Sequence, residues 1–231
     1  MSSASAAFPS PEQHGGLPRA AEATPHEALP QGYPHHEVGS LGLPHRKVLM
    51  WAFLGSDCMF FGTLIATYLA YKGKSLVGPY PRDILNIPVT SASTFVLLMS
   101  SLLMVLTLAA AQRGDLKRFR LWCAGTALLG LIFLGFQVYE FHEFVHAGLT
   151  LSRSLFGSTF FVLTGTHGTH VLFGVIWLAS LFFYSFRPGG VTAERAGDVE
   201  IAGLYWHFVD IVWIVIFTVV YLVEFVSAGH I

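Results

Sequence analysis

The sequence predicts an all-α protein, a polytopic membrane helical bundle with five transmembrane helices. Three observations support this fold class. Hydrophobic residues make up 53% of the 231-residue chain and charged residues only 12%, about half the share of roughly 25% that soluble domains carry. Five segments each contain the ~20 mostly apolar residues that one span needs. Between these segments lie polar, Gly/Pro-rich or basic connections.

The five predicted spans cover about 48–71, 90–112, 121–146, 155–186 and 201–226. The third and fourth are longer than one bilayer thickness, so we expect them to tilt or to project beyond the hydrocarbon core. Residues 46–231 therefore form one transmembrane domain.

Residues 1–45 have a different composition. They contain seven of the eleven prolines and five of the eleven histidines, and they lack an apolar run. Such a segment buries too little apolar surface to offset its ordering entropy, so we predict a disordered tail. It also lacks the apolar core of a signal peptide, so we expect the chain to insert through its first span.

Charge and cysteine content argue against a nucleic-acid-binding protein and against a disulfide scaffold. A net charge of −1 with a pI near 6.8 gives no basic footprint, which argues against a nucleic-acid partner. Cys58 and Cys123 both lie in apolar runs without metal-type spacing, and this favours buried thiols over disulfides.

The distribution of cations predicts the orientation. Nine of the 13 Lys and Arg residues lie on the side of the tail and four on the other side. By the positive-inside rule, the N-terminus is in the cytoplasm and the C-terminus is outside.

The fifth span carries four unusual residues within two turns, namely Trp206, His207, Asp210 and Trp213. An Asp at the centre of a membrane helix costs roughly 2.5–3.5 kcal/mol, so it needs protein or water around it. His207 and Asp210 are three residues apart and can satisfy each other on one helix face. The span is therefore expected to lie among other helices.

Asp57 lies about ten residues into the first span, and Asp210 lies equally far into the fifth, which enters from the same side. At 1.5 Å per residue, both carboxyls should lie about 15 Å from the inner end, in one layer. Two interpretations remain open: a proton-holding carboxyl, or two structural polar contacts between helices.

His167 and His170 lie on one face of the fourth span, among small residues that allow close helix packing. We expect them to form hydrogen bonds between helices. Two histidines on one helix do not complete a metal site, which disfavours ligation.

His142, Glu143 and His146 fit the HExxH pattern of zinc proteases. The pattern lies at the outer end of its helix, and a working site needs a third protein ligand. Asp210, the candidate that the chain offers, is expected near the opposite surface. An intramembrane zinc protease is therefore the weaker interpretation.

Four motifs, in order, resemble subunit III of the haem–copper respiratory terminal oxidases. They are FLGSDCMFF (53–61), QVYEF (137–141), GSTFFVLTGTHGTHVLFG (157–174) and YWHFVDIVW (205–213). The resemblance implies a non-catalytic accessory subunit that supports proton uptake and stabilises catalytic subunit I, its main contact. It also implies other oxidase subunits as partners, bound phospholipid, no cofactor in this chain, and haem and copper in the partner subunits.

The five-helix form is similar to bacterial members, which implies a bacterial inner (plasma) membrane. The electron donor stays open between cytochrome c, which is favoured, and quinol. The resemblance implies no catalytic residue and no metal ligand in this chain. Its carboxyl sites fall on Asp57 and Glu140, and its polar and aromatic positions fall on His167, His170, Trp206, His207, Asp210 and Trp213.

This chain departs from the family at two points. Many members have Glu where this chain has Asp57, and the seven-helix members have two additional N-terminal helices. A stand-alone proton-coupled transporter is the rival from another class, since intramembrane Asp and His suit it. Transporters usually show repeated halves and broken helices, and five uneven spans show neither.

Overall fold

The computed structural model describes residues 44–74, 87–150 and 154–223. The long helices are α1 (His45–Tyr71), α3 (Ile87–Gln112), α4 (Leu116–His146), α5 (Leu155–Tyr184) and α6 (Ala196–Ile216). The short 3-10 turn η2 (Ala193–Arg195) precedes α6, and the π-helix η3 (Phe217–Leu222) continues it.

The predicted fold class is confirmed. Within the described ranges, five helices are long and apolar enough to cross a membrane, and no residue there lies in a β-strand. The predicted disordered tail, except for its last two residues, lies outside the described residues. So do residues 224–226 at the end of the fifth predicted span.

Helix α4 begins at a capping residue and not where hydropathy changes. Gly114 has a φ of 69°, which turns the chain between α3 and α4. Asp115 then accepts a hydrogen bond from the backbone N–H of Arg118 at 3.1 Å and caps α4. Consequently α4 begins at Leu116, five residues before the predicted span, and includes the basic turn up to Arg120.

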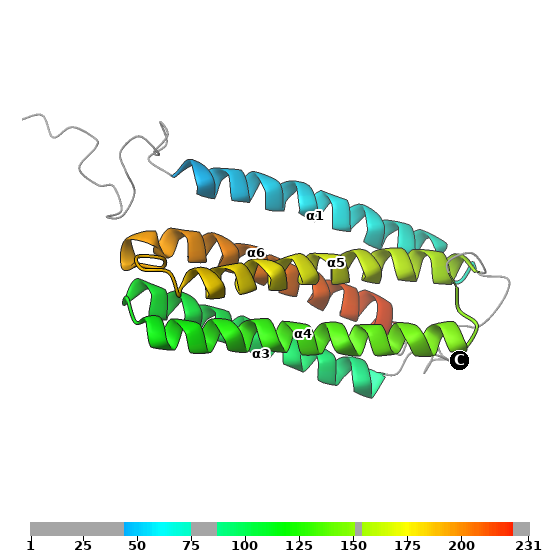
Figure 1. Ribbon diagram of the computed structural model, residues 1–231. Helices are drawn as coiled ribbons and strands as arrows, with labels where there is room; N and C mark the ends of the chain where they lie inside the picture. The colour runs from blue at the N-terminus through cyan, green and yellow to red at the C-terminus, as the bar shows by residue number, and fades with distance from the viewer. Residues whose placement is uncertain (1–43, 75–86, 151–153, 224–231) are drawn as a thin grey trace, which may run out of the picture. The chain divides into compact units, whose positions relative to one another are not determined.

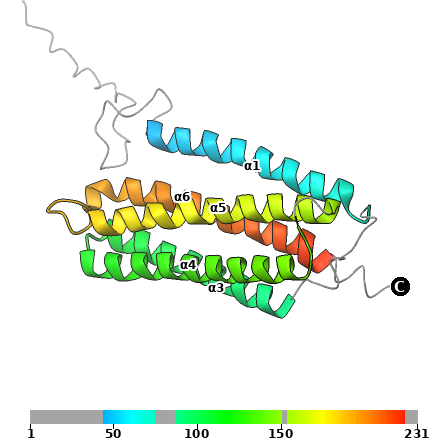
Figure 2. The ribbon, with the colours of Figure 1, turned by 45° about the vertical axis from the view of Figure 1, so that its right-hand side comes forward.

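The helices are arranged in three layers. In both ribbon views α1 lies on one side, α5 and α6 lie in the middle, and α3 and α4 lie on the other side (Figures 1 and 2). α3 packs along α4, while α6 packs against α3, α5 and α1. This central position makes α6 the most buried span: half of its apolar window is buried, against 6% for α1.

Trp206 occupies the centre of the bundle and is only 1% exposed. Its ring lies between α4 and α5 because both helices have a glycine there. A Cβ atom on Gly130 would lie 2.6 Å from Trp206 Cη2, and one on Gly174 would lie 2.8 Å from Cζ3. These two glycines therefore leave the space that the indole fills.

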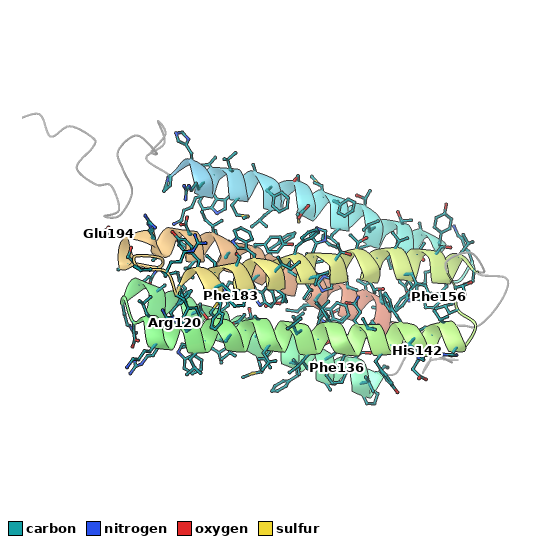
Figure 3. The ribbon with its side chains drawn as sticks, viewed as in Figure 1. Arg120, Phe136, His142, Phe156, Phe183 and Glu194 are labelled. Carbon is teal, nitrogen blue, oxygen red and sulfur yellow. The ribbon has the colours of Figure 1, made fainter. Side chains whose placement is uncertain are left out.

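Two ion pairs attach the first turn of α1 to α6. Arg46 Nη1 lies 2.7 Å from Asp198 Oδ1, and Lys47 Nζ lies 2.7 Å from Glu200 Oε1. The same end of the bundle contains Arg120 and Glu194, whereas His142 and Phe156 lie at the opposite end (Figure 3). Arg46, Lys47, Arg120 and Glu194 thus lie at one end of the bundle, which we call the charged end.

Candidate proton-holding site and polar contacts in the bundle

Asp57 on α1 faces His170 on α5. Asp57 Oδ2 lies 3.5 Å from His170 Nε2, and the two side chains are only 14% and 18% exposed. The other ring nitrogen of His170, Nδ1, lies 2.8 Å from the carbonyl oxygen of Thr166. A carbonyl can only accept, so Nδ1 carries a hydrogen and Nε2 is the nitrogen left to interact with Asp57.

The chemistry of this pair follows from that tautomer. Nε2 is able to accept a hydrogen bond from a carboxyl hydrogen, or to donate one to a carboxylate when the ring carries a second hydrogen. The contact is at ion-pair distance, and Oδ2 has no hydrogen bond within the described residues. Asp57 and His170 thus place two ionisable side chains next to each other between α1 and α5.

Aromatic side chains surround the pair. The ring of Phe61 lies 4.9 Å from that of His170, and the hydroxyl of Tyr205 donates a hydrogen bond to the carbonyl oxygen of His170 at 2.9 Å. Tyr205 also stacks on Phe53 at 6.3 Å. These contacts connect α1, α5 and α6 next to the Asp57–His170 pair.

His167 lies one turn before His170 but makes no comparable polar contact. It is fully buried, it stacks on Trp213 with ring centroids 5.0 Å apart, and it meets Phe133 edge-on at 6.0 Å. Neither of its ring nitrogens has a hydrogen-bond partner among the described residues. We expected a hydrogen bond across the helix contact, and the structure instead shows ring packing.

Three side chains of α6 reach polar groups on α3. Trp206 Nε1 donates to Ser100 Oγ at 3.0 Å, and Trp213 Nε1 donates to Thr94 Oγ1 at 2.9 Å. His207 Nδ1 lies 2.6 Å from Ser101 Oγ. None of the three α3 partners was predicted, although the run VTSASTFVLLMSS is rich in Ser and Thr for an apolar span.

The expected pairing of His207 with Asp210 is wrong. The side chain of Ser101 lies next to both His207 and Asp210. Its hydroxyl forms its hydrogen bond with His207 Nδ1. Asp210 is 3% exposed, and neither of its carboxyl oxygens has a hydrogen-bond partner in the part of the chain that the structure describes. The reason is that α3 packs closely on α6 and places a hydroxyl next to the imidazole.

A second buried carboxyl, that of Glu140, lies toward the end of the bundle that is opposite Arg120 and Glu194. The hydroxyl of Thr90 on α3 donates a short hydrogen bond to Glu140 Oε1 on α4, and both residues are buried. Tyr221 of the π-helix faces the same two side chains. The predicted acidic position Glu140 therefore connects α3, α4 and η3.

The HExxH pattern forms only a two-residue contact. His142 Nε2 lies 3.0 Å from His146 Nε2, and both residues are exposed at the end of α4. Among the described residues, no group of three or more His, Cys, Asp or Glu is positioned to hold a metal ion. The pattern therefore does not assemble the ligand set of a zinc protease there.

The fold and these sites define a polytopic membrane subunit with ionisable side chains packed between its helices. A model of the family described as cytochrome c oxidase subunit III matches residues 46–225. The chain belongs to this family and is an accessory subunit III of a terminal oxidase.

The chain is similar to subunit 3 of cytochrome c oxidases and also to subunit 3 of quinol oxidases. Cytochrome c oxidase subunit 3 of Bacillus sp. (strain PS3) is 43% identical over 177 residues, which is 77% of this chain and 85% of the relative. Quinol oxidase subunit 3 of Bacillus subtilis (strain 168) is 41% identical over 172 residues, 74% of this chain and 84% of the relative.

Proposed function

We propose that this chain supports proton supply to catalytic subunit I of a proton-translocating oxidase and stabilises that subunit during O2 reduction, without transferring electrons itself. The observation that carries the proposal is the Asp57–His170 pair. Its carboxyl and imidazole groups lie 3.5 Å apart between α1 and α5, at a depth where an unpaired carboxylate would be costly. Family membership supplies the terminal oxidase as its context.

Further roles are assigned to the remaining polar sites. Glu140 is a second proton-holding carboxyl, and His207 and Asp210 are polar membrane sites. The ring contacts of His167, Trp206 and Trp213 hold the helices together, whereas His170 also joins α5 to Asp57. Haem and copper belong to the partner subunits in this proposal.

A groove at the charged end of the bundle supports the proposal of bound phospholipid. It measures about 570 Å³ and lies between α1, α5 and α6. Phe53 and Trp177 line its apolar part, and Arg46 and Asp198 line its polar part. An acyl chain fits the first and a headgroup fits the second.

The chain is proposed to lie in a bacterial plasma membrane with its N-terminus in the cytoplasm. The end that carries Arg46, Lys47 and Arg120 would then face the cytoplasm. A stand-alone transporter is the alternative to this assignment. Co-purification of the chain with haem-containing subunits in mild detergent would support the oxidase role and argue against the transporter.

The test of the proton-holding role is O2 consumption by fully assembled complexes, measured against pH and against turnover number. Asp57→Asn keeps the side-chain volume but cannot hold the proton. We expect lower activity at alkaline pH, or faster loss of activity during sustained turnover, with an unchanged haem spectrum. Asp57→Glu should be tolerated. Glu143→Gln, an exposed carboxyl on α4, is the matched control and should behave as the wild type.

Indistinguishable curves for the wild type, Asp57→Asn and Asp57→Glu would show that Asp57 is a structural polar contact only. His170→Phe provides an independent check, because it removes the other half of the pair while keeping a ring against Phe61. If the pair holds the proton, this variant should show the same defect as Asp57→Asn.

A further inference from the structure

His207 presents one ring nitrogen to the outside of the bundle. The ring is half-buried, and its Nδ1 atom contacts Ser101. Its Nε2 atom makes no hydrogen bond within the described part of the chain. This atom is also not one of the fully buried polar atoms without a partner, so part of its surface is accessible. One polar atom of His207 is therefore accessible from outside the bundle.

This nitrogen lies at mid-membrane depth. His207 follows the first residue of α6, Ala196, by 11 residues, which corresponds to about 17 Å along the helix. Ser101 follows Ile87 by 14 residues, which corresponds to about 21 Å along α3. Both positions fall well inside a hydrocarbon core of about 30 Å. Lipid chains offer no hydrogen bond there, so a polar atom facing them is costly.

Exposed apolar side chains flank the nitrogen. Helical spacing places Leu98 and Val105 on the same side of α3 as Ser101, and Ile211 on the same side of α6 as His207. These three side chains are 41%, 51% and 59% exposed. We refer to Leu98, Ser101, Val105, His207 and Ile211 as the α3/α6 face.

We propose that the α3/α6 face is the docking surface for a membrane helix of another oxidase subunit, and that this helix places a hydrogen-bonding side chain opposite His207 Nε2. The inference rests on the proposed function, which supplies the class of partner. Apolar contacts at Val105 and Ile211 would hold the helices together, and the polar contact would fix their register. A protein helix fits better than lipid because it can satisfy the nitrogen at this depth.

Photo-crosslinking in the assembled complex tests the location. A photoreactive phenylalanine analogue replaces Val105 or Ile211 on the proposed surface, or Leu131 or Ile176 as exposed controls on α4 and α5. We expect crosslinks to an oxidase subunit from the first two positions and lower yields from the controls. Crosslinks only to lipid, or to a second copy of this chain, would overturn the inference, as would equal or higher yields from the controls.

The same experiment separates this inference from the proposed function. If the chain co-purifies with haem-containing subunits but crosslinks to them only from Leu131 or Ile176, the oxidase role stands and the docking surface is wrong. If it co-purifies with no such subunit, the proposed function itself fails, and the inference fails with it.

Two substitutions of His207 test the polar contact. His207→Gln places an amide near the position of Nε2, whereas His207→Asn places one near Nδ1 and keeps only the contact with Ser101. Interhelical hydrogen bonds in membranes are worth about 0.6–1.7 kcal/mol, so we expect a roughly three- to twentyfold weaker association for His207→Asn. His207→Gln should stay near the wild type.

The opposite order, with Asn retained and Gln weakened, would mean that His207 acts only through Ser101, and it would overturn the polar contact. Wild-type association for both variants would overturn it as well. The measurement is the fraction of tagged chain that stays with the oxidase during detergent titration.

Discussion

His167 is positioned by the packing of its ring and not by hydrogen bonds from its nitrogens. It stacks on Trp213 and meets Phe133 edge-on, while both nitrogens have no hydrogen-bond partner among the described residues. Its neighbour His170 makes the polar contact with Asp57. Two histidines three residues apart thus have different roles. They point in different directions from α5, because His167 faces the centre of the bundle and His170 faces α1.

We predict that His167→Phe leaves stability unchanged or raises it. Phe keeps the stack on Trp213 and removes two buried polar atoms, and replacing a buried polar group with an apolar one of similar shape is nearly neutral or stabilising. His167→Ala, the control, removes the ring and should cost about 3 kcal/mol. Thermal unfolding in detergent measures both. Equal losses for the two variants would show that the nitrogens are needed.

α6 depends on small residues in its neighbours. Gly174→Ala would place a Cβ atom 2.8 Å from the Trp206 ring, so we predict a loss of about 1–3 kcal/mol from overpacking. Gly55→Ala on α1 is the control, since no atom lies within 4 Å of its Cβ position. That variant should be neutral or slightly stabilising, because Ala is the better helix former. A Tm for Gly174→Ala at or above that of Gly55→Ala would contradict the prediction.

The sequence predicted the helices better than their contacts. Hydropathy found five spans, and the cost of a buried carboxyl singled out Asp57 and Asp210. The sequence did not reveal that Ser101, and not Asp210, contacts His207. This contact depends on which face of α3 packs against α6. The π-helix at Phe217–Leu222 was also missed, since its residues are apolar like those of an ordinary span.

At the scale of the whole molecule, the distribution of cations predicts the orientation. A reporter that is active only outside the cytoplasm should be active when fused after Ile231. The same reporter inserted after Gly189, between α5 and α6, should be inactive, because that loop lies on the proposed cytoplasmic side. Activity at Gly189 with none at Ile231 would reverse the orientation.

The contacts of α1 with α5 and α6 have a consequence for biosynthesis. Asp57 and His170 are 113 residues apart in the chain, so a ribosome that adds about 5–20 residues per second makes His170 roughly 6–23 s after Asp57. Helices α3 and α4 are synthesised in that interval, but α1 packs mainly on α5 and α6. During this time the carboxyl of Asp57 cannot pair with His170, and the newly inserted α1 is retained in the bilayer by its own apolar residues.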